Sequence, residues 1–432
     1  MCPAAQAKST PPGRLDESQG APGNVWYQEL IMLRPGQSGQ QVALRRTQEL
    51  SKSNCCDPFM VADLDKLVSR HWAFCRALPR VTPFYAVKCN NSPWVLRILA
   101  ALGTGFDCAS QMELEQVLGL GVSPSRIIYA NPCKAISSIQ YAARHGVQLM
   151  TFDSEEELAK VAQYHPEARL VLRLWTHDTN STFQLSSKFG ARRQKWEHLF
   201  QSARDLGLAV VGVSFHVGSD CQSAHTFTQA LEDCRHVIEM GRRMGCDMSL
   251  LDIGGGFPGK EGSEPKFEEM ASVINDCLSR DFPERDGVAI ISEPGRFYAE
   301  SVFIAAVNII AKKVESEPGG HRKFMYYLSE GHYGSFRILL RERDPRRPIV
   351  AKELSSDAPL FPCTLFGPTC DSMDLLSREE VQLPELDVGD WLLFPSMGAY
   401  TCVMSSTFNG FLPASICYAM GPAVRSLLET TP

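Results

Sequence analysis

The chain reads Pro83-Phe84-Tyr85-Ala86-Val87-Lys88-Cys89-Asn90 where a short apolar run ends abruptly on a lysine. An apolar strand would give the terminal amine a rigid base and remove part of its water. Because burial disfavours the charged form, we expect the pKa of Lys88 to be lowered and its neutral amine to be nucleophilic. Such a lysine suits Schiff-base chemistry with an aldehyde cofactor. A surface lysine that ends a strand is the alternative.

Short β-like runs alternate with amphipathic helical stretches on both sides of this segment. The predicted strands are Pro83–Lys88, Gly105–Ala109, Arg126–Ala130, Val147–Phe152, Arg169–Trp175, Ala209–Val217, Ser249–Ile253 and Val288–Ser292. The helical patterns between them include Ser92–Leu102, Gln111–Leu120, Ser154–Gln163, Lys195–Leu206, Thr226–Met244 and Lys266–Leu278. This alternation predicts an α/β fold with a (β/α)8 TIM-like barrel, and a doubly wound open sheet is the competing fold.

The rhythm changes after Ser301, where β-branched and aromatic runs separated by Pro and Gly take over. These runs are Val302–Lys312, Lys323–Leu328, Pro362–Phe366 and Asp390–Phe394. We therefore predict a C-terminal all-β domain over residues 301–432 that follows a barrel over residues 56–300. Residues 25–55 are expected to add strand elements to the β domain, and residues 1–24 to form a disordered tail.

Composition narrows the functional class. The 432 residues are 44% hydrophobic and carry a formal charge of −6, which argues against nucleic acid or an anionic membrane as a partner. No apolar run approaches the roughly 18 residues that span a bilayer. The 15 cysteines lack CxxC pairs and His partners at metal spacing. We therefore expect free thiols, a cytoplasmic location and no metal site.

Reactive side chains fall at the ends of the predicted strands. In a (β/α)8 barrel those ends form the mouth in which active sites lie. The strand ends carry Lys88, Asp107, Arg173, His216, the loop Gly254-Gly255-Gly256, and Glu293 followed by Arg296. This arrangement predicts one site at the mouth.

The glycine loop follows an apolar strand in the sequence LDIGGGFPG, residues 251–259. Unobstructed backbone N–H groups there can bind a phosphate. The same glycines match the dinucleotide pattern GxGxxG, but that pattern should open a helix directly, and Pro258 and a polar loop intervene. We favour a monophosphate site over a dinucleotide site, with a simple tight turn as the third possibility.

Four residues near the glycine loop suit an aromatic phosphate cofactor. Glu293 could keep a ring nitrogen protonated, and Arg296 could neutralise the phosphate. His216 could stack on the ring, and Ser219 could donate a hydrogen bond to the phosphate. A surface ion pair and a histidine without a role are the alternatives.

A thiol adjoins a carboxylate in Gly367-Pro368-Thr369-Cys370-Asp371, within the predicted β domain. Cys370 could donate a proton, and Asp371 could bind a substrate cation. A buried structural cysteine is the alternative, because this turn has to reach the barrel mouth in order to act.

With these residues assembled, the chain resembles the eukaryotic ornithine decarboxylase family of pyridoxal-phosphate enzymes. The resemblance runs from about residue 25 to the end. Its motifs are PFYAVKCN, GFDCAS, IIYANPCK, SFHVGS, LLDIGGGFPG, EPGRFY, FGPTCD and MGAYT…STFNGF. The family's fold is a (β/α)8 barrel followed by a β domain.

The resemblance implies a role for each motif residue. Lys88 should bind the aldehyde of pyridoxal 5'-phosphate, Glu293 its pyridinium nitrogen, and His216 its ring. The phosphate ligands should be Ser219, Gly254, Gly255, Gly256, Arg296 and Tyr400, with Asp107, Glu113 and Arg173 as supporting residues. Cys370 should reprotonate the α-carbon, and Asp371 should receive the distal amine of a diamino substrate. Cys370 and Asp371 should come from the partner subunit of a homodimer with shared sites, joined by a Lys188–Asp374 ion pair.

Two positions depart from the family pattern. After YGSF the family has a tyrosine and an aspartate, whereas this chain has Arg341-Glu342 followed by Arg343. Weakening a buried charge pair costs about 2–5 kcal/mol, so we expect ornithine to be a poor substrate and a neutral aliphatic amino acid such as leucine to replace it. Asp371 argues the other way. Asp220 replaces a glycine after Ser219, and its charge is expected to loosen the cofactor.

Some relatives in this family have lost catalysis and bind antizyme, the regulator of ornithine decarboxylase. This chain retains the cofactor and thiol motifs, which favours an L-amino-acid decarboxylase over a non-catalytic antizyme-binding regulator. The segment Asn131–Thr151 matches the antizyme-binding region and keeps Lys134, but Gln140 stands where a basic residue is expected. We expect antizyme binding to be weak or absent.

Overall fold

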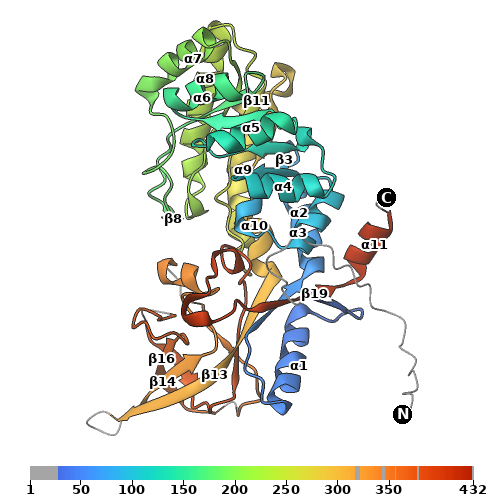
Figure 1. Ribbon diagram of the computed structural model, residues 1–432, viewed down its shortest axis with the longest axis vertical. Coiled ribbons are helices and arrows are strands. Elements are labelled where there is room, and N and C mark those ends of the chain that lie inside the picture. The colour runs from blue at the N-terminus through green and yellow to red at the C-terminus, as the bar shows by residue number, and fades with distance from the viewer. Residues whose placement is uncertain (1–27, 317–321, 343–345, 356, 377–378, 431–432) are drawn as a thin grey trace, which may run out of the picture.

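The computed structural model describes residues 28–316, 322–342, 346–355, 357–376 and 379–430. A helix-rich domain and a strand-rich domain lie end to end (Figure 1). No helix of the described residues is long and apolar enough to cross a membrane.

The helix-rich domain is a closed barrel in which every strand pairs in parallel with its neighbours. Its strands are β3 (Val81–Ala86), β4 (Gly105–Cys108), β5 (Ile127–Tyr129), β6 (Leu149–Phe152), β7 (Arg169–Arg173), β9 (Ala209–Ser214), β11 (Leu250–Asp252) and β12 (Ala289–Ser292). These are the eight predicted strands, with ends that differ by a few residues. Because β12 pairs with β3, the sheet closes, which confirms the barrel over the open sheet.

A helix follows each barrel strand. These helices are α3 (Pro93–Ala101), α4 (Gln111–Gly119), α5 (Ile136–Arg144), α6 (Glu155–Tyr164), α7 (Trp196–Asp205), α8 (His225–Arg243), α9 (Glu264–Asp281) and the short α10 (Arg296–Ala299). Helix α2 (Leu64–Ala77) precedes β3. Ser110 and Ser154 cap α4 and α6 by accepting hydrogen bonds from the backbone N–H groups of Glu113 and Glu157, which explains where these helices start.

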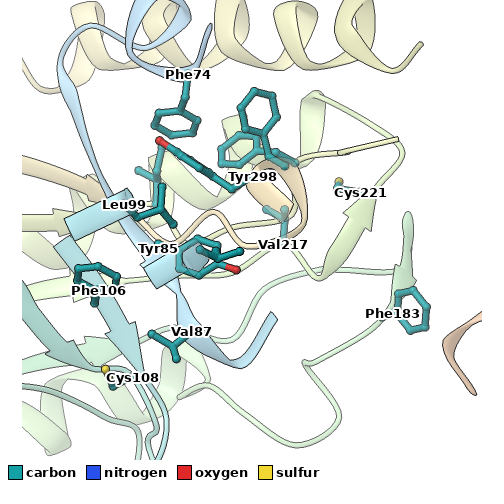
Figure 2. Close-up of a cluster of buried hydrophobic side chains, with 14 of the residues drawn as sticks. Phe74, Tyr85, Val87, Leu99, Phe106, Cys108, Phe183, Val217, Cys221 and Tyr298 are labelled. Atoms are coloured by element: carbon teal, nitrogen blue, oxygen red, sulfur yellow. The ribbon is translucent and has the colours of Figure 1, made fainter. Parts of the chain in front are cut away.

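Apolar side chains fill the barrel interior. They are Phe84, Ile128, Ala130, Val171, Val211, Leu250 and Ile291. A Cβ on Gly105 would lie 2.5 Å from the ring of Phe84, so this position of β4 requires glycine. A second cluster packs between strands and helices and includes Tyr85, Val87, Phe106 and Tyr298 (Figure 2). The interior is therefore a packed core, and the free space lies at the mouth.

The strand-rich domain is a nine-stranded sheet in which β18 joins β13 and β15 beside the main strand order β1-β19-β2-β13-β14-β16-β17. Its strands are β1 (Gln28–Met32), β2 (Phe59–Asp63), β13 (Phe303–Ser316), β14 (Arg322–Leu328), β15 (Ile349–Val350), β16 (Leu360–Phe366), β17 (Val381–Pro384), β18 (Trp391–Phe394) and β19 (Ser415–Met420). The sheet includes all four strands predicted after residue 301.

Three features of this domain differ from the prediction. Strand β2 pairs with β13 and β19, so the barrel begins after Asp63 and not at residue 56. Residues 28–32 join the sheet as strand β1, whereas residues 39–52, for which no helix was predicted, form helix α1 (Gly39–Lys52) with a capping box between Ser38 and Gln41. The domain is not all-β either, because it also contains helix α11 (Pro422–Thr430).

Helix α11 returns to the barrel and packs against α2 and α3. The carboxylate of Asp65, in α2, accepts hydrogen bonds from the backbone N–H groups of Gly421, Ala423 and Val424. These are the N–H groups that a helix start leaves without partners. Asp65 therefore fixes the C-terminal helix to the barrel domain.

Candidate functional site

A cavity of about 430 Å³ opens at the carboxyl ends of the barrel strands. Eight of the predicted site residues line it: Lys88, Arg173, His216, Ser219, Glu293, Arg296, Arg341 and Tyr400. The rest of the lining is Ala109, Ala130, Asn131, Pro132, Cys133, Phe183, Leu185, Lys188, Phe189, Ile338 and Met404. The structure thus brings residues from both domains to one site.

Lys88 lies in a single 3₁₀ turn, Val87–Cys89, directly after β3. The Tyr85 hydroxyl donates a hydrogen bond of 2.8 Å to the carbonyl of Asn90, which closes this turn against the core. The Lys88 amine forms an ion pair with Asp107, at the end of β4. The amine is thereby fixed at the floor of the cavity.

The pKa of Lys88 differs from the prediction. Burial lowers it, but the carboxylates of Asp107 and Glu293 raise it more, so the net shift is upward. The prediction of a lowered pKa was wrong because it considered only the apolar residues before Lys88 and not these two carboxylates. Burial raises the pKa of Asp107 to about 7 despite the Lys88 cation.

Glu293 follows β12 and is 4% exposed. Burial, together with the neighbouring Asp252, raises its pKa to about 8. Its Oε1 atom is buried and has no hydrogen-bond partner. An unpaired buried oxygen is costly, so this atom is ready to accept a donor from a bound ligand.

His216 follows β9, and its Nδ1 atom accepts a hydrogen bond of 3.0 Å from the backbone N–H of Gly218. Burial lowers its pKa well below the usual value, and Arg173 and Lys88 lower it further. The ring is therefore neutral near pH 7, with its proton on Nε2. A flat, neutral imidazole suits contact with an aromatic ring.

The glycine loop approaches neighbouring backbone too closely for any side chain. A Cβ on Gly254 would lie 2.2 Å from the carbonyl oxygen of Phe215, and one on Gly255 would lie 2.7 Å from that of Glu293. Gly256 has a φ of +106°, which favours glycine. The next helix, α9, starts only at Glu264. In a dinucleotide site the glycine loop should lead directly into a helix, so this gap favours a monophosphate site.

Arg296 stands beside this loop as the first residue of α10. Its Nε atom donates a hydrogen bond of 3.2 Å to the Ser219 hydroxyl, whereas its Nη2 atom is buried without a partner. The ring of Tyr400 lies 5.5 Å from the Arg296 guanidinium carbon. A free guanidinium nitrogen beside bare backbone suits an anion.

Cys370 and Asp371 do not line the cavity of their own chain. Cys370 is exposed, and its backbone N–H donates to the side chain of Asn409. Asp371 accepts a hydrogen bond from the Tyr333 hydroxyl. Their supply by a second subunit stays a prediction, as does the Lys188–Asp374 ion pair, since Lys188 lines the cavity and Asp374 is buried in its own loop.

Arg341 and Glu342 separate in the structure. Arg341 lines the cavity, and its guanidinium carbon lies 5.1 Å from the centre of the Phe183 ring. Glu342 is outside the cavity lining, where it forms ion pairs with Arg346 at 2.6 Å and Lys260 at 3.0 Å. This placement departs from the predicted substrate contact of Glu342. Arg343 lies outside the described residues.

Sequence reasoning missed the apolar part of the lining. Phe183, Leu185 and Phe189 belong to the long connection between β7 and α7, which contains the small strand β8 (Ser181–Phe183) paired with β10 (Ser219–Cys221). A connection of this length with three large apolar residues was the available signal.

Comparison with known proteins shows the family to which the chain is similar. Residues 64–300 match the family described as pyridoxal-dependent decarboxylase, pyridoxal binding domain. The chain is 53% identical to antizyme inhibitor 2 of Xenopus laevis, over 88% of this chain and 85% of that protein. It is 49% identical to ornithine decarboxylase of Mus pahari, over 92% of this chain and 88% of that protein.

A solved structure shares the whole architecture. The arginine decarboxylase of Paramecium bursaria Chlorella virus, bound to agmatine, superposes with a TM-score of 0.82 and is 35% identical. The match covers 87% of this chain and all of that one. The residues present fit pyridoxal phosphate, because Glu293 Oε1 and Arg296 Nη2 are unpaired buried groups of the kind that a ring nitrogen and a phosphate require.

We expect Lys88→Ala to abolish covalent cofactor binding, because Lys88 supplies the amine at the floor of the cavity. The visible absorbance band of bound cofactor should disappear, and borohydride reduction should leave no pyridoxyl group on the protein. Lys188→Ala is the matched control, since Lys188 also lines the cavity, and it should keep the band. A pyridoxyl adduct on any lysine other than Lys88 in the wild-type protein would contradict this assignment.

We expect Asp220→Gly to tighten cofactor binding about fivefold, because it removes an anion next to Ser219, the predicted phosphate ligand. Glycine also adopts the positive φ of 55° at this position without strain. Asp220→Asn is the control, since it removes the charge and keeps a partner for Thr182, whose hydroxyl donates to Asp220 at 2.7 Å. Cofactor titration measures both. Equal affinities in all three proteins would show that Asp220 does not weaken binding.

Proposed function

Because this chain belongs to the family of pyridoxal-dependent decarboxylases, we propose that it decarboxylates a free L-amino acid and releases carbon dioxide and an amine. The observation that carries this proposal is that Lys88, Glu293 and Arg296 line one cavity, in which Glu293 Oε1 and Arg296 Nη2 are buried without a partner. A protein that had lost the reaction would have no need to keep these two buried polar atoms unpaired beside the Lys88 amine.

The chain's own residues divide the work among them. Bound pyridoxal phosphate supplies the electron sink for the carbanion left when carbon dioxide departs. Lys88 binds the cofactor aldehyde, and Glu293 accepts from the ring nitrogen and favours its protonated form. His216 packs on the ring, while Arg296 and the glycine loop bind the phosphate.

Proton return to the product is assigned to Cys370 from a second copy of the chain. Within one chain Cys370 is exposed and Asp371 is half-buried, and both lie outside the cavity. Asp374 holds the loop that carries them, because its carboxylate accepts hydrogen bonds from the backbone N–H groups of Thr369 and His332. A rigid, exposed loop that carries a thiol and a carboxylate suits insertion into a neighbouring subunit. We therefore propose a homodimer with shared sites.

The charge of the cavity favours a neutral substrate over ornithine. Five cationic side chains line the cavity, against one carboxylate, that of Glu293; the cations are Lys88, Arg173, Lys188, Arg296 and Arg341. Arg341 is held in place by its contact with the Phe183 ring. A second ammonium on the substrate would face this positive charge, whereas a branched aliphatic side chain would contact Phe183, Ile338 and Met404.

A non-catalytic regulator that binds antizyme is the second candidate, favoured by the similarity to antizyme inhibitor 2. The structure gives one argument against it. Lys134, in the predicted antizyme-binding segment, is fully buried and forms an ion pair of 2.9 Å with Glu157. Its amine also donates to the carbonyl oxygens of Asn131 and Thr151, so it does not face a partner.

We expect a panel of L-amino acids to give carbon dioxide from leucine with a kcat/KM at least about tenfold above that for ornithine, since one misplaced charge costs more than 1.4 kcal/mol. Arg341→Ala should raise the ornithine value, and Arg341→Lys, which keeps the charge, should leave the order unchanged. Efficient turnover of ornithine alone would overturn the substrate assignment. No turnover of any amino acid, together with stoichiometric antizyme capture, would favour the regulator.

We expect mixtures of Lys88→Ala and Cys370→Ala proteins to recover about a quarter of wild-type carbon dioxide release, although each variant alone is inactive. Random exchange of subunits makes half of the dimers mixed, and each mixed dimer contains one complete site. Activity measured after co-expression tests this, with each variant alone as the control. Absence of recovery, with mixed dimers present by mass, would contradict shared sites.

A further inference from the structure

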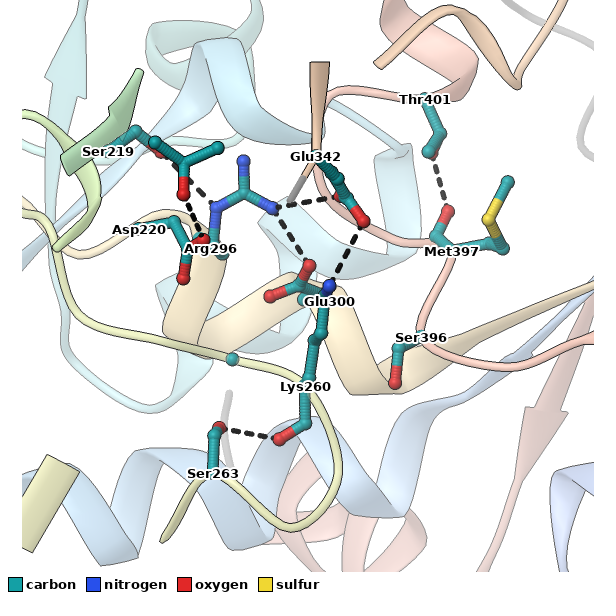
Figure 3. Close-up of polar contacts among 12 residues, drawn as sticks. Ser219, Asp220, Lys260, Ser263, Arg296, Glu300, Glu342, Ser396, Met397 and Thr401 are labelled. Carbon is teal, nitrogen blue, oxygen red and sulfur yellow. Dashed lines mark hydrogen bonds and ion pairs between the residues drawn. The ribbon is translucent and has the colours of Figure 1, made fainter. Parts of the chain in front are cut away.

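Five charged side chains meet at the junction of the two domains, and we call this group the junction cluster. Figure 3 shows Arg296, Glu300, Lys260 and Glu342 of this group. The barrel domain contributes Arg296, Glu300 and Lys260, and the strand-rich domain contributes Glu342 and Arg346. Glu300 Oε1 accepts from Arg296 at 2.8 Å and from Arg346 at 2.9 Å. Glu342 bridges Arg346 at 2.6 Å and Lys260 at 3.0 Å, and lies 3.8 Å from Arg296.

The junction cluster is deeply buried. The side chains of Arg296, Glu300, Glu342 and Arg346 are 1–4% exposed, and only Lys260, at 32%, reaches solvent. Burial would raise the pKa of Glu342, but Arg346 and Lys260 lower it overall, so its carboxylate is ionised. Three cations and two carboxylates leave a net charge of +1.

The four buried members balance in charge, since two guanidinium groups face two carboxylates, and the extra positive charge belongs to Lys260 at the surface. The open position is on Arg296, whose Nη2 atom has no partner and whose Nε atom donates to Ser219. Its Nη1 atom is fully engaged by Glu300. The cluster therefore holds one edge of the guanidinium and leaves another free for the phosphate.

Glu342 is essential to this balance. Without its carboxylate, Arg346 would keep the neutral acceptors Pro395 and Met397 and share the single Glu300 Oε1 atom with Arg296, so the two guanidinium groups would compete for one carboxylate oxygen. Arg296 would then face a second, unneutralised arginine in a site that excludes water. We expect its guanidinium to shift away from Arg346 and lose its fixed direction.

The backbone explains why Glu342 serves this cluster and Arg341 serves the cavity. Glu342 is extended, with φ −72° and ψ 145°, and follows a short 3₁₀ segment, Arg337–Arg341. The backbone therefore changes from 3₁₀ to extended between Arg341 and Glu342, and the two side chains leave it in different directions. Arg341 therefore lines the cavity, and the next residue faces the junction.

We propose that Glu342 and Arg346 are positioning residues that act through Glu300 to fix Arg296 for the cofactor phosphate. The acid that follows Arg341 thus serves cofactor binding across the domain junction and not substrate recognition. The inference rests on cofactor binding and not on decarboxylation. Its failure would therefore leave the proposed reaction untouched, and the reverse holds as well.

The test compares pyridoxal phosphate with pyridoxal, which lacks the phosphate. Full-length protein freed of cofactor is titrated with each ligand, and binding is followed by absorbance. Glu342→Gln should raise the Kd for pyridoxal phosphate about tenfold and change the Kd for pyridoxal less than about twofold. A general loss of structure would weaken both ligands by the same factor.

The matched control is Asp281→Asn. Asp281 is also a buried carboxylate, 4% exposed, held by Arg235 at 3.0 Å and Arg280 at 2.7 Å, but it ends α9 far from the phosphate ligands. This variant should alter neither Kd. Equal changes for the two ligands in Glu342→Gln, or no change, would overturn the proposal.

A second variant keeps the proposal testable if Glu342→Gln does not fold. Arg346→Lys keeps the charge but has a single nitrogen in place of the guanidinium that bridges Glu300 and Glu342. It should lower the ratio of the two affinities in the same direction by at least about threefold. An unchanged ratio in folded Arg346→Lys protein would contradict the role of this cluster.

Discussion

The pairing of β3 with β12 is the constraint on which the site depends. These strands lie about two hundred residues apart in the sequence, yet Ser292 stands opposite Pro83 in the closed barrel. The backbone N–H of Ala86 then donates to the carbonyl of Pro294 at 3.3 Å. Lys88 and Glu293 therefore face the same space, because each follows its strand directly. An open sheet with the same strands would separate the amine from the acid.

Closure of the barrel also sets the electrostatics. It brings Lys88 close to the buried carboxyl groups of Asp107 and Glu293, so that each of the three groups alters the pKa of the others. The two carboxyl groups raise the pKa of the Lys88 amine, so it stays protonated. Burial raises the pKa of Asp107 to about 7 and that of Glu293 to about 8. The hydrogen bonding of these side chains is incomplete, since Glu293 and Asp107 each retain one buried oxygen without a partner. The site therefore has unsatisfied hydrogen-bond acceptors to which a charged aromatic ligand can donate.

Local patterns were sufficient to predict the barrel, because each strand is a short apolar run that ends at Gly, Pro or a polar residue. The same logic failed at β2 (Phe59–Asp63), which looks like a barrel strand next to a helix. Its partners, β13 and β19, lie more than two hundred residues further along the chain, so nearness in sequence was misleading. Helix α1 was missed because its buried side, Val42 and Ala43, is narrow.

For the site residues too, some features could be predicted from local sequence and others could not. Lys88, His216 and Glu293 could be found from strand ends alone, since the barrel fixes where strand ends meet. The shift in the pKa of Lys88 could not be predicted in this way. Its direction depends on whether burial or the two carboxylates, which are distant in the sequence, have the larger effect. The direction of Glu342 also required coordinates, since Arg346 lies four residues further on and Lys260 lies in the other domain.

The pair Arg341-Glu342 shows why a change next to a binding pocket has to be interpreted with its backbone. The two residues replace a tyrosine and an aspartate expected from the resemblance, and both changes seem at first to concern the substrate. In the structure one side chain faces the cavity and the other faces the junction cluster. A glutamate has one methylene more than an aspartate, and that length lets it bridge Arg346 and Lys260. The same local change therefore has two consequences. The substrate side of the pocket loses an acidic side chain, and the cofactor side gains a carboxylate, that of Glu342, that pairs with Arg346 and Lys260.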